Sequence, residues 1–196
     1  MKKIFLVLIL FFGSIEILNA EVNRITSGNK EAKITIIAYE SLTCSHCADF
    51  HKDIYPQLKK DYIDTGLVKI EFRHFPLDVA AFNASKISQC KIGKGLEILN
   101  SLYSNQQEWV RGNTVEEIND NLKKFIKNQG FEVNFEKCIN NKRIEDYVLN
   151  DRIEGTKKFK VNATPTIIIN DEKFEKTLNY KNLKLVILVQ HIEHPL

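Results

Sequence analysis

The residues in this sequence that could most readily do chemistry are its four cysteines. Cys44 and Cys47 form a single Cys-x-x-Cys motif, whereas Cys90 and Cys138 stand apart. Such a motif can be half of a zinc site, a disulfide clip or a redox centre. A zinc ion usually takes four Cys or His ligands, and the histidines show no pattern that would complete such a set. We therefore expect no metal and favour a redox pair.

The position of Cys44 suits a reactive thiolate. Cys44 follows a predicted strand and a short turn, and it precedes a predicted helix whose dipole favours an anion at its start. The thiolate is the nucleophile, so Cys44 should attack and Cys47, one turn later and facing inward, should resolve. A protonated His46 would stabilise the Cys44 thiolate and make the disulfide a stronger oxidant. The alternative for His46 is an exposed polar residue at a helix start.

The pattern of apolar residues predicts an α/β domain interrupted by helices. Alternation and β-branched runs predict strands over residues 33–39, 68–73, 166–170 and 173–175. Apolar residues three and four apart predict a helix from Cys44 to Leu58, which Pro56 should kink. Only helical patterns occur over 78–160, including a capping box at Thr114 and Glu117. Gly130 is predicted to cap one of these helices, and a final helix closes the chain.

The first 20 residues have the order of a secretory signal peptide. Lys2 and Lys3 precede an apolar run over 4–12, and cleavage is expected after Ala20. An uncleaved membrane anchor is the alternative, but the apolar run is shorter than a spanning helix needs. The chain has 28 Lys and Arg against 25 Asp and Glu. Because this is not the strongly basic balance of a nucleic-acid-binding domain, we expect no nucleic-acid partner.

Together, three features resemble the DsbA family of bacterial periplasmic disulfide oxidoreductases. They are Cys44-Ser45-His46-Cys47 between strand and helix, the helical stretch, and Ala163-Thr164-Pro165-Thr166 before a strand. The resemblance covers nearly all of the mature chain and implies a thioredoxin-like fold with an inserted all-helical subdomain. The expected boundaries are a signal peptide at 1–20, the first part of the thioredoxin-like domain at 21–77, the insertion at 78–150 and the second part at 151–196.

The resemblance also implies a function and its partners. It implies oxidation of unfolded, newly secreted proteins in the periplasm, no cofactor, and a membrane quinone-linked reoxidant of the DsbB type. It further implies that the Thr164–Pro165 peptide bond is cis and lies against Cys44 and Cys47. The backbone of Thr164 would then be offered to a bound peptide.

The sequence departs from the family at two positions. Ser45 stands where members often have proline, and Ala38 stands where they often have a buried acid. Glu40 lies two residues further on, hence on the same face of the strand. Glu40 is therefore a candidate proton acceptor for Cys47, and the alternative is a solvated glutamate at the strand end.

The remaining cysteines are predicted to form a structural disulfide. Once Cys44 and Cys47 are paired, Cys90 and Cys138 are left, and each has apolar neighbours in a predicted helical segment. The alternative is two buried, reduced cysteines.

Two other functions compete with the oxidase. One is a disulfide reductase or isomerase of the same fold, and the other is a non-catalytic, chaperone-like binding protein. Isomerases of this group are generally dimers with an added N-terminal domain. The stretch between Ala20 and the first predicted strand has no room for such a domain, so we expect a monomer.

Overall fold

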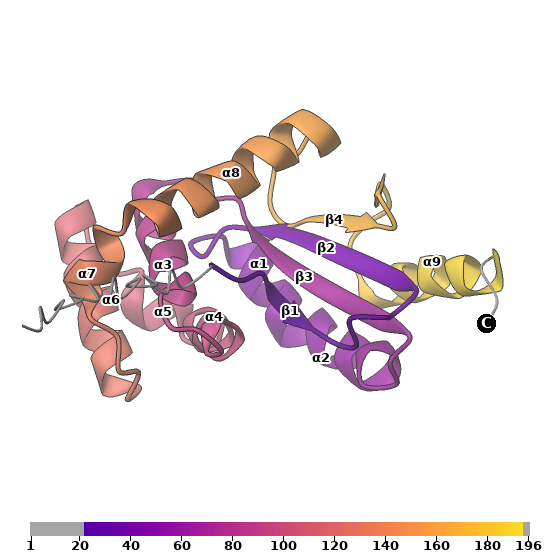
Figure 1. The fold of residues 1–196 in the computed structure, drawn as a ribbon, viewed down its shortest axis with the longest axis horizontal. Helices are drawn as coiled ribbons and strands as arrows, with labels where there is room; N and C mark the ends of the chain where they lie inside the picture. The colour runs from indigo at the N-terminus through magenta and orange to yellow at the C-terminus, as the bar shows by residue number, and fades with distance from the viewer. Residues whose placement is uncertain (1–21, 194–196) are drawn as a thin grey trace, which may run out of the picture.

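The computed structural model describes residues 22–193, and these are built around a mixed five-stranded sheet of order β1-β3-β2-β4-β5 (Figure 1). Strands β2 and β3 are parallel, and the other neighbouring pairs are antiparallel. The strands are β1 (Ile25–Ser27), β2 (Ile34–Glu40), β3 (Val68–His74), β4 (Thr166–Ile169) and β5 (Glu172–Lys173). The four predicted strands are present with ends within two residues of the predicted ones. Strand β1 is an additional edge strand that the sequence did not reveal. The predicted signal peptide lies outside the described residues.

Each face of the central strand β2 is covered by helices. Ile36 and Ala38 are fully buried toward the side of α1 and α2, whereas Tyr39 is buried in a separate cluster on the other face. Helix α8 (Lys142–Phe159) lies over that second face (Figure 1). A Cβ at Gly155 would stand 2.7 Å from the Tyr39 ring, so the absence of a side chain lets α8 lie close to the sheet.

The helix after Cys44 is continuous but irregular. It runs through α1 (Ser45–Asp49), the π-helical turn η1 (Phe50–Ile54), α2 (Tyr55–Leu58) and a second π-helical turn η2 (Lys59–Ile63). Pro56 lies in the first turn of α2, directly after η1, and it has no N–H to donate within this continuous helix. A π-helical turn thus directly precedes the turn that holds Pro56, and the kink predicted there stays a prediction.

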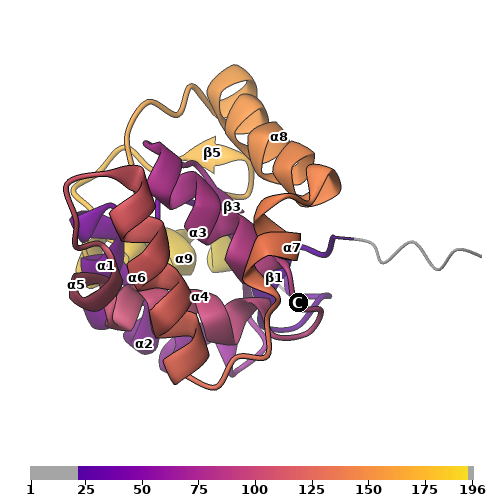
Figure 2. The ribbon, with the colours of Figure 1, turned by 90° about the vertical axis from the view of Figure 1, so that its left-hand side faces the viewer.

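The predicted helical stretch between β3 and β4 is also present. Apart from α8, its helices lie at one end of the sheet (Figure 1), and Figure 2 looks onto that end. Besides α8 the stretch contains α3 (Val79–Gln89), α4 (Gly95–Ser104), α5 (Gln106–Trp109), α6 (Val115–Asn128) and α7 (Phe135–Ile139). Thr114 caps α6 by accepting from the amide of Glu117 at 3.2 Å, and Gly130 follows that helix with φ +74°. The expected domain boundary at residue 150 falls inside α8, which is one continuous helix.

The chain then returns to the sheet. A two-residue turn joins β4 to β5, and both Asn170 and Asp171 have positive φ there, which matches the right-handed twist of a hairpin. Helix α9 (Tyr180–Glu193) buries Leu183 and Ile187 in the core shared with α1 and α2. Across residues 22–193, none of the helices has both the length and the apolar character to cross a membrane.

Candidate active site

The fold places Cys44 and Cys47 in very different surroundings. Cys44 is the N-cap of α1, with an extended backbone (φ −78°, ψ 122°), and its side chain is partly exposed. Cys47 lies in the first turn of the same helix and is completely buried. Both are free thiols in this structure. The Cys44 sulfur is therefore partly open to solvent, whereas the Cys47 sulfur is enclosed by the protein.

These surroundings shift the two thiol pKa values in opposite directions. A hydrogen bond from the Cys47 thiol is the largest influence that lowers the pKa of Cys44, to about 5. Partial burial opposes this shift, and Thr164 and the backbone amides of Cys47 and His46 assist it. Burial is the main cause that raises the pKa of Cys47, and the hydrogen bond to Cys44 and the charge of Glu40 act in the same direction. At neutral pH Cys44 is the thiolate and Cys47 the thiol.

The Thr164–Pro165 peptide bond is cis, as the resemblance implies. The Cys44 Sγ lies 3.3 Å from the carbonyl oxygen of Thr164, so the segment before β4 lies directly against the exposed thiol. A cavity of about 580 Å³ adjoins this contact, and α1, η1, Thr164, Pro165 and residues 178–180 line it. The Cys44 sulfur therefore contacts Thr164, which is one of the residues that line this cavity.

Glu40 is buried, so the alternative of a solvated glutamate is wrong. Its side chain is 3% exposed and its Oε2 lies 2.9 Å from Nε2 of His51, which is 4% exposed. The His51 ring stacks on Tyr103 with the centroids 4.1 Å apart. His51 was not singled out from the sequence. The available signal was its spacing, since it follows Cys47 by four residues and so shares that face of the helix.

The His46 side chain, by contrast, points into solvent. It is 81% exposed, and its Nδ1 lies 3.7 Å from a carboxylate oxygen of Asp49, one turn further along α1. His46 is among the residues that lower the pKa of Cys44, and it does so through its backbone amide. The hydrogen bond from His46 to the Cys44 sulfur therefore comes from the backbone at the start of α1 and not from the imidazole.

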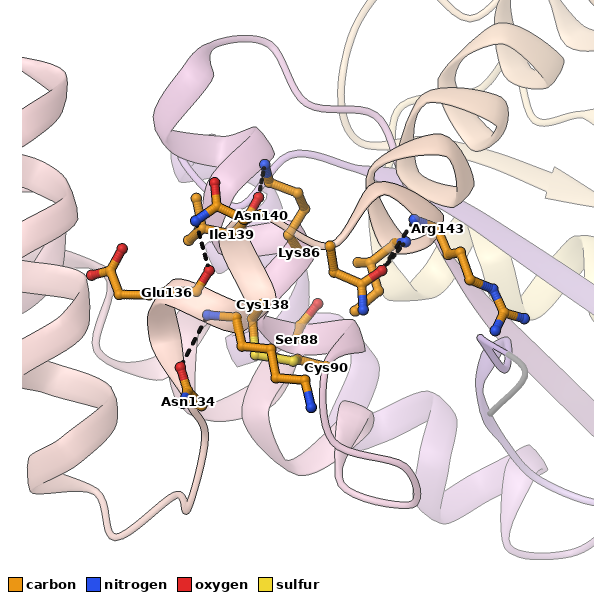
Figure 3. Close-up of a disulfide and its surroundings, with 12 residues drawn as sticks. Lys86, Ser88, Cys90, Asn134, Glu136, Cys138, Ile139, Asn140 and Arg143 are labelled. Atoms are coloured by element: carbon orange, nitrogen blue, oxygen red, sulfur yellow. Dashed lines mark hydrogen bonds between the residues drawn. A yellow bond between two sulfur atoms is a disulfide. The ribbon is translucent and has the colours of Figure 1, made fainter. Parts of the chain in front are cut away.

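The predicted pairing of Cys90 with Cys138 is present as a disulfide with a Cα–Cα distance of 5.6 Å (Figure 3). It ties the end of α3 to the short helix α7. Lys86, only 4% exposed, reinforces the same junction because its Nζ donates to the Ile139 carbonyl at 2.7 Å. Asn134 caps α7 by accepting from the amide of Lys137.

Comparison with known proteins agrees with this arrangement. A family model described as thioredoxin matches residues 20–188. The chain is 27% identical over 155 residues to a protein named as a protein-disulfide oxidoreductase in Rickettsia typhi, covering 78% of this chain and 57% of the relative. It is 26% identical over 170 residues to disulfide bond formation protein D of Bacillus subtilis, covering 82% and 73%. The chain thus spans little more than half the length of the Rickettsia relative.

A solved structure extends the similarity to the whole fold. The crystal structure of α-DsbA1 from Wolbachia pipientis matches with a TM-score of 0.77 at 29% identity, over 91% of this chain and 96% of that one. The family model covers most of the chain, and the structural match includes the inserted helices. The chain therefore belongs to the thioredoxin family, as a DsbA-like member of the disulfide oxidoreductases with an inserted helical subdomain.

Proposed function

We propose that this protein is a dithiol oxidase that introduces disulfide bonds into unfolded, newly secreted proteins. The observation that carries the proposal is the contrast between Cys44, whose thiolate is stabilised at the start of α1, and the buried, protonated Cys47. A stabilised thiolate favours the reduced dithiol, and this makes the Cys44–Cys47 disulfide a strong oxidant.

The reaction consists of two thiol–disulfide exchanges. A substrate thiolate attacks Cys44 Sγ in the Cys44–Cys47 disulfide. The bond between the two sulfurs breaks, and Cys47 leaves as a thiolate that takes up a proton. A second substrate thiolate then attacks the substrate sulfur of the mixed disulfide and releases Cys44 as its stabilised thiolate. The substrate has lost two electrons, which the Cys44–Cys47 dithiol now holds and which a reoxidant must remove.

Two groups near the cysteines are assigned roles in these steps. Glu40 would exchange the proton with Cys47, since its carboxylate is buried close enough for its charge to raise the Cys47 pKa, and His51 would hold it in place. The Thr164 backbone would pair with the extended substrate beside the cis-proline. His46 would add a positive charge when it is protonated, and its exposure makes this a small effect in water.

The cellular setting is part of the same proposal. The protein would be exported by the signal peptide over 1–20, act as a monomer in the periplasm, and be reoxidised by a quinone-linked membrane protein of the DsbB type. Fusion of residues 1–40 to alkaline phosphatase, which is active only after export, tests the first step. A fusion that lacks residues 1–20 is the control.

The direction of the reaction is tested by comparing two activities of the purified protein. An oxidase should reoxidise reduced, unfolded ribonuclease A in stoichiometric amounts and have an equilibrium with glutathione that strongly favours its own reduced form. The Cys44→Ser variant is the control. Rapid reduction of insulin together with an inability to oxidise ribonuclease would instead identify a reductase. Binding of unfolded chains without either activity would identify a chaperone-like protein.

A further inference from the structure

The turn that leads into Cys44 is held from the helical insertion by a buried glutamine. Gln106, the first residue of α5, is 7% exposed. Its Nε2 donates to the carbonyl oxygen of Leu42 at 2.8 Å and to that of Cys44 at 3.1 Å. Carbonyl oxygens can only accept, so the nitrogen of the amide must face them, and both of its hydrogens are used.

Helix α5 is a firm support for this contact although it is short. Trp109, three residues after Gln106, is fully buried, and its Nε1 donates to the Leu102 carbonyl in α4 at 2.9 Å. Helix α5 also packs along α6. The Gln106 amide is thereby held in place by the insertion. Its two hydrogen bonds join it to Leu42 and Cys44, which lie 64 and 62 residues earlier in the sequence.

The Cys44 carbonyl is also where α1 begins. It accepts the amides of Cys47 and Ala48, both at 3.2 Å, in addition to the Gln106 amide. The orientation of this peptide group decides how the first turn of α1 meets the Cys44 sulfur. A contact that fixes the carbonyl therefore also fixes the amides that stabilise the thiolate.

We propose that Gln106 is a positioning residue that holds the Cys44 turn in the geometry that stabilises its thiolate. Ser45 is the first helical position after the Cys44 N-cap, where a proline ring would fix the backbone in advance. With serine there, the constraint comes instead from the insertion through Gln106. The redox consequence rests on the proposed function, whereas the effect on the Cys44 thiol does not.

The test compares Gln106→Met, which keeps the length of the side chain but has no N–H donor, with Gln107→Met at the exposed neighbouring position. The rate of Cys44 alkylation by iodoacetamide is measured against pH, with the melting temperature as a check on folding. Gln106→Met should raise the midpoint by about one pH unit, which makes alkylation about tenfold slower at pH 4. The equilibrium constant for reduction of the Gln106→Met disulfide by glutathione should fall about tenfold. Gln107→Met should have the alkylation midpoint and the equilibrium constant of the original protein.

A second substitution separates positioning from mere destabilisation. In the Gln106→Met background, Ser45→Pro should move the alkylation midpoint back toward the original value. Gln106→Leu, which also has no donor, serves if Gln106→Met does not fold. An unchanged midpoint in the glutamine variants, or a raised midpoint that Ser45→Pro does not reverse, would overturn the proposal. Alkylation requires no turnover, so a failure of the oxidase assay would leave this result interpretable.

Discussion

The Cys90–Cys138 disulfide should contribute a large part of the stability of the helical insertion. The bond joins residues separated by 48 positions. The chain-entropy model gives about 4 kcal/mol for closing a loop of that length in the unfolded chain. Helix α7, which carries Cys138, has only five residues, and an isolated helix this short is not stable in water. Replacing both cysteines with alanine should therefore release α7 from α3 as well as lengthen the free loop.

The expected change is readily measured. For a protein of this size, 1 kcal/mol corresponds to about 2–4 °C in melting temperature. The Cys90→Ala/Cys138→Ala variant should therefore melt about 8–16 °C below the original protein in scanning calorimetry without reductant. The proposed oxidase activity at 25 °C should largely remain, because the bond joins α3 to α7 whereas Cys44 lies at the start of α1.

The matched control is Cys44→Ser/Cys47→Ser, which keeps the Cys90–Cys138 bond. The melting temperature of that control should not fall by a comparable amount, because its Cys90–Cys138 loop is still closed. Peptide mass mapping of the non-reduced protein should recover the Cys90–Cys138 linked peptides. A melting temperature for the alanine variant within 2 °C of the original would refute the reasoning. So would free thiols at both positions, or a link from Cys90 to the active-site pair.

The remaining predictions concern the reactive pair. Limiting alkylating agent at pH 6 should label Cys44 almost alone, and equal labelling of Cys47 by mass spectrometry would contradict the assignment. His46→Ala should make the protein a weaker oxidant by less than the roughly 30 mV that corresponds to one pKa unit, because the imidazole is exposed; an unchanged glutathione equilibrium would remove His46 from the mechanism. Glu40→Gln should slow the attack of Cys47 on a Cys44 mixed disulfide by about a hundredfold, a typical loss for a proton-transfer group. A faster attack in stopped flow would show that the Glu40 charge acts only by raising the Cys47 pKa. Finally, the folded state lowers the pKa of Cys44 to about 5, so its stabilising contribution is complete above the unfolded value near 8.5 and is lost as pH falls through 5. Urea unfolding of the reduced protein should therefore show stability rising over this range relative to Cys44→Ser; His74, whose pKa burial lowers to about 4, is common to both proteins and cancels.

The elements that the sequence predicted well are those with a strong local signal. Strand β3 alternates buried and partly exposed residues along its length, and Thr114 caps α6 where the capping box predicted it. Strand β1 was missed because it has only three residues. What defines β1 as a strand is its pairing with β3, in which Ile25 lies opposite Phe72. A contact across that much chain leaves no periodic pattern in a three-residue segment.

The same distinction applies to the site. Cys44, Cys47 and Pro165 could be singled out because their residue types carry the chemistry or the family motif. The burial of Glu40 could not be predicted, because it depends on His51 and the stacked Tyr103 closing over the strand end. Glutamate at a strand end is usually solvated, and only the packing of another helix makes it an interior group.

The Cys44 turn receives contacts from two separate places in the insertion, and these separate its chemistry from the stability of α7. Asp78, which caps the start of α3, accepts from the Thr43 hydroxyl at 2.6 Å. Gln106 holds the Leu42 and Cys44 carbonyls from α5. The Cys90–Cys138 bond lies at the opposite end of α3 from Asp78, and α5 packs on α4 and α6. Neither contact to the turn is made by α7. We therefore expect loss of the disulfide to lower the stability of the insertion more than it changes the Cys44 pKa.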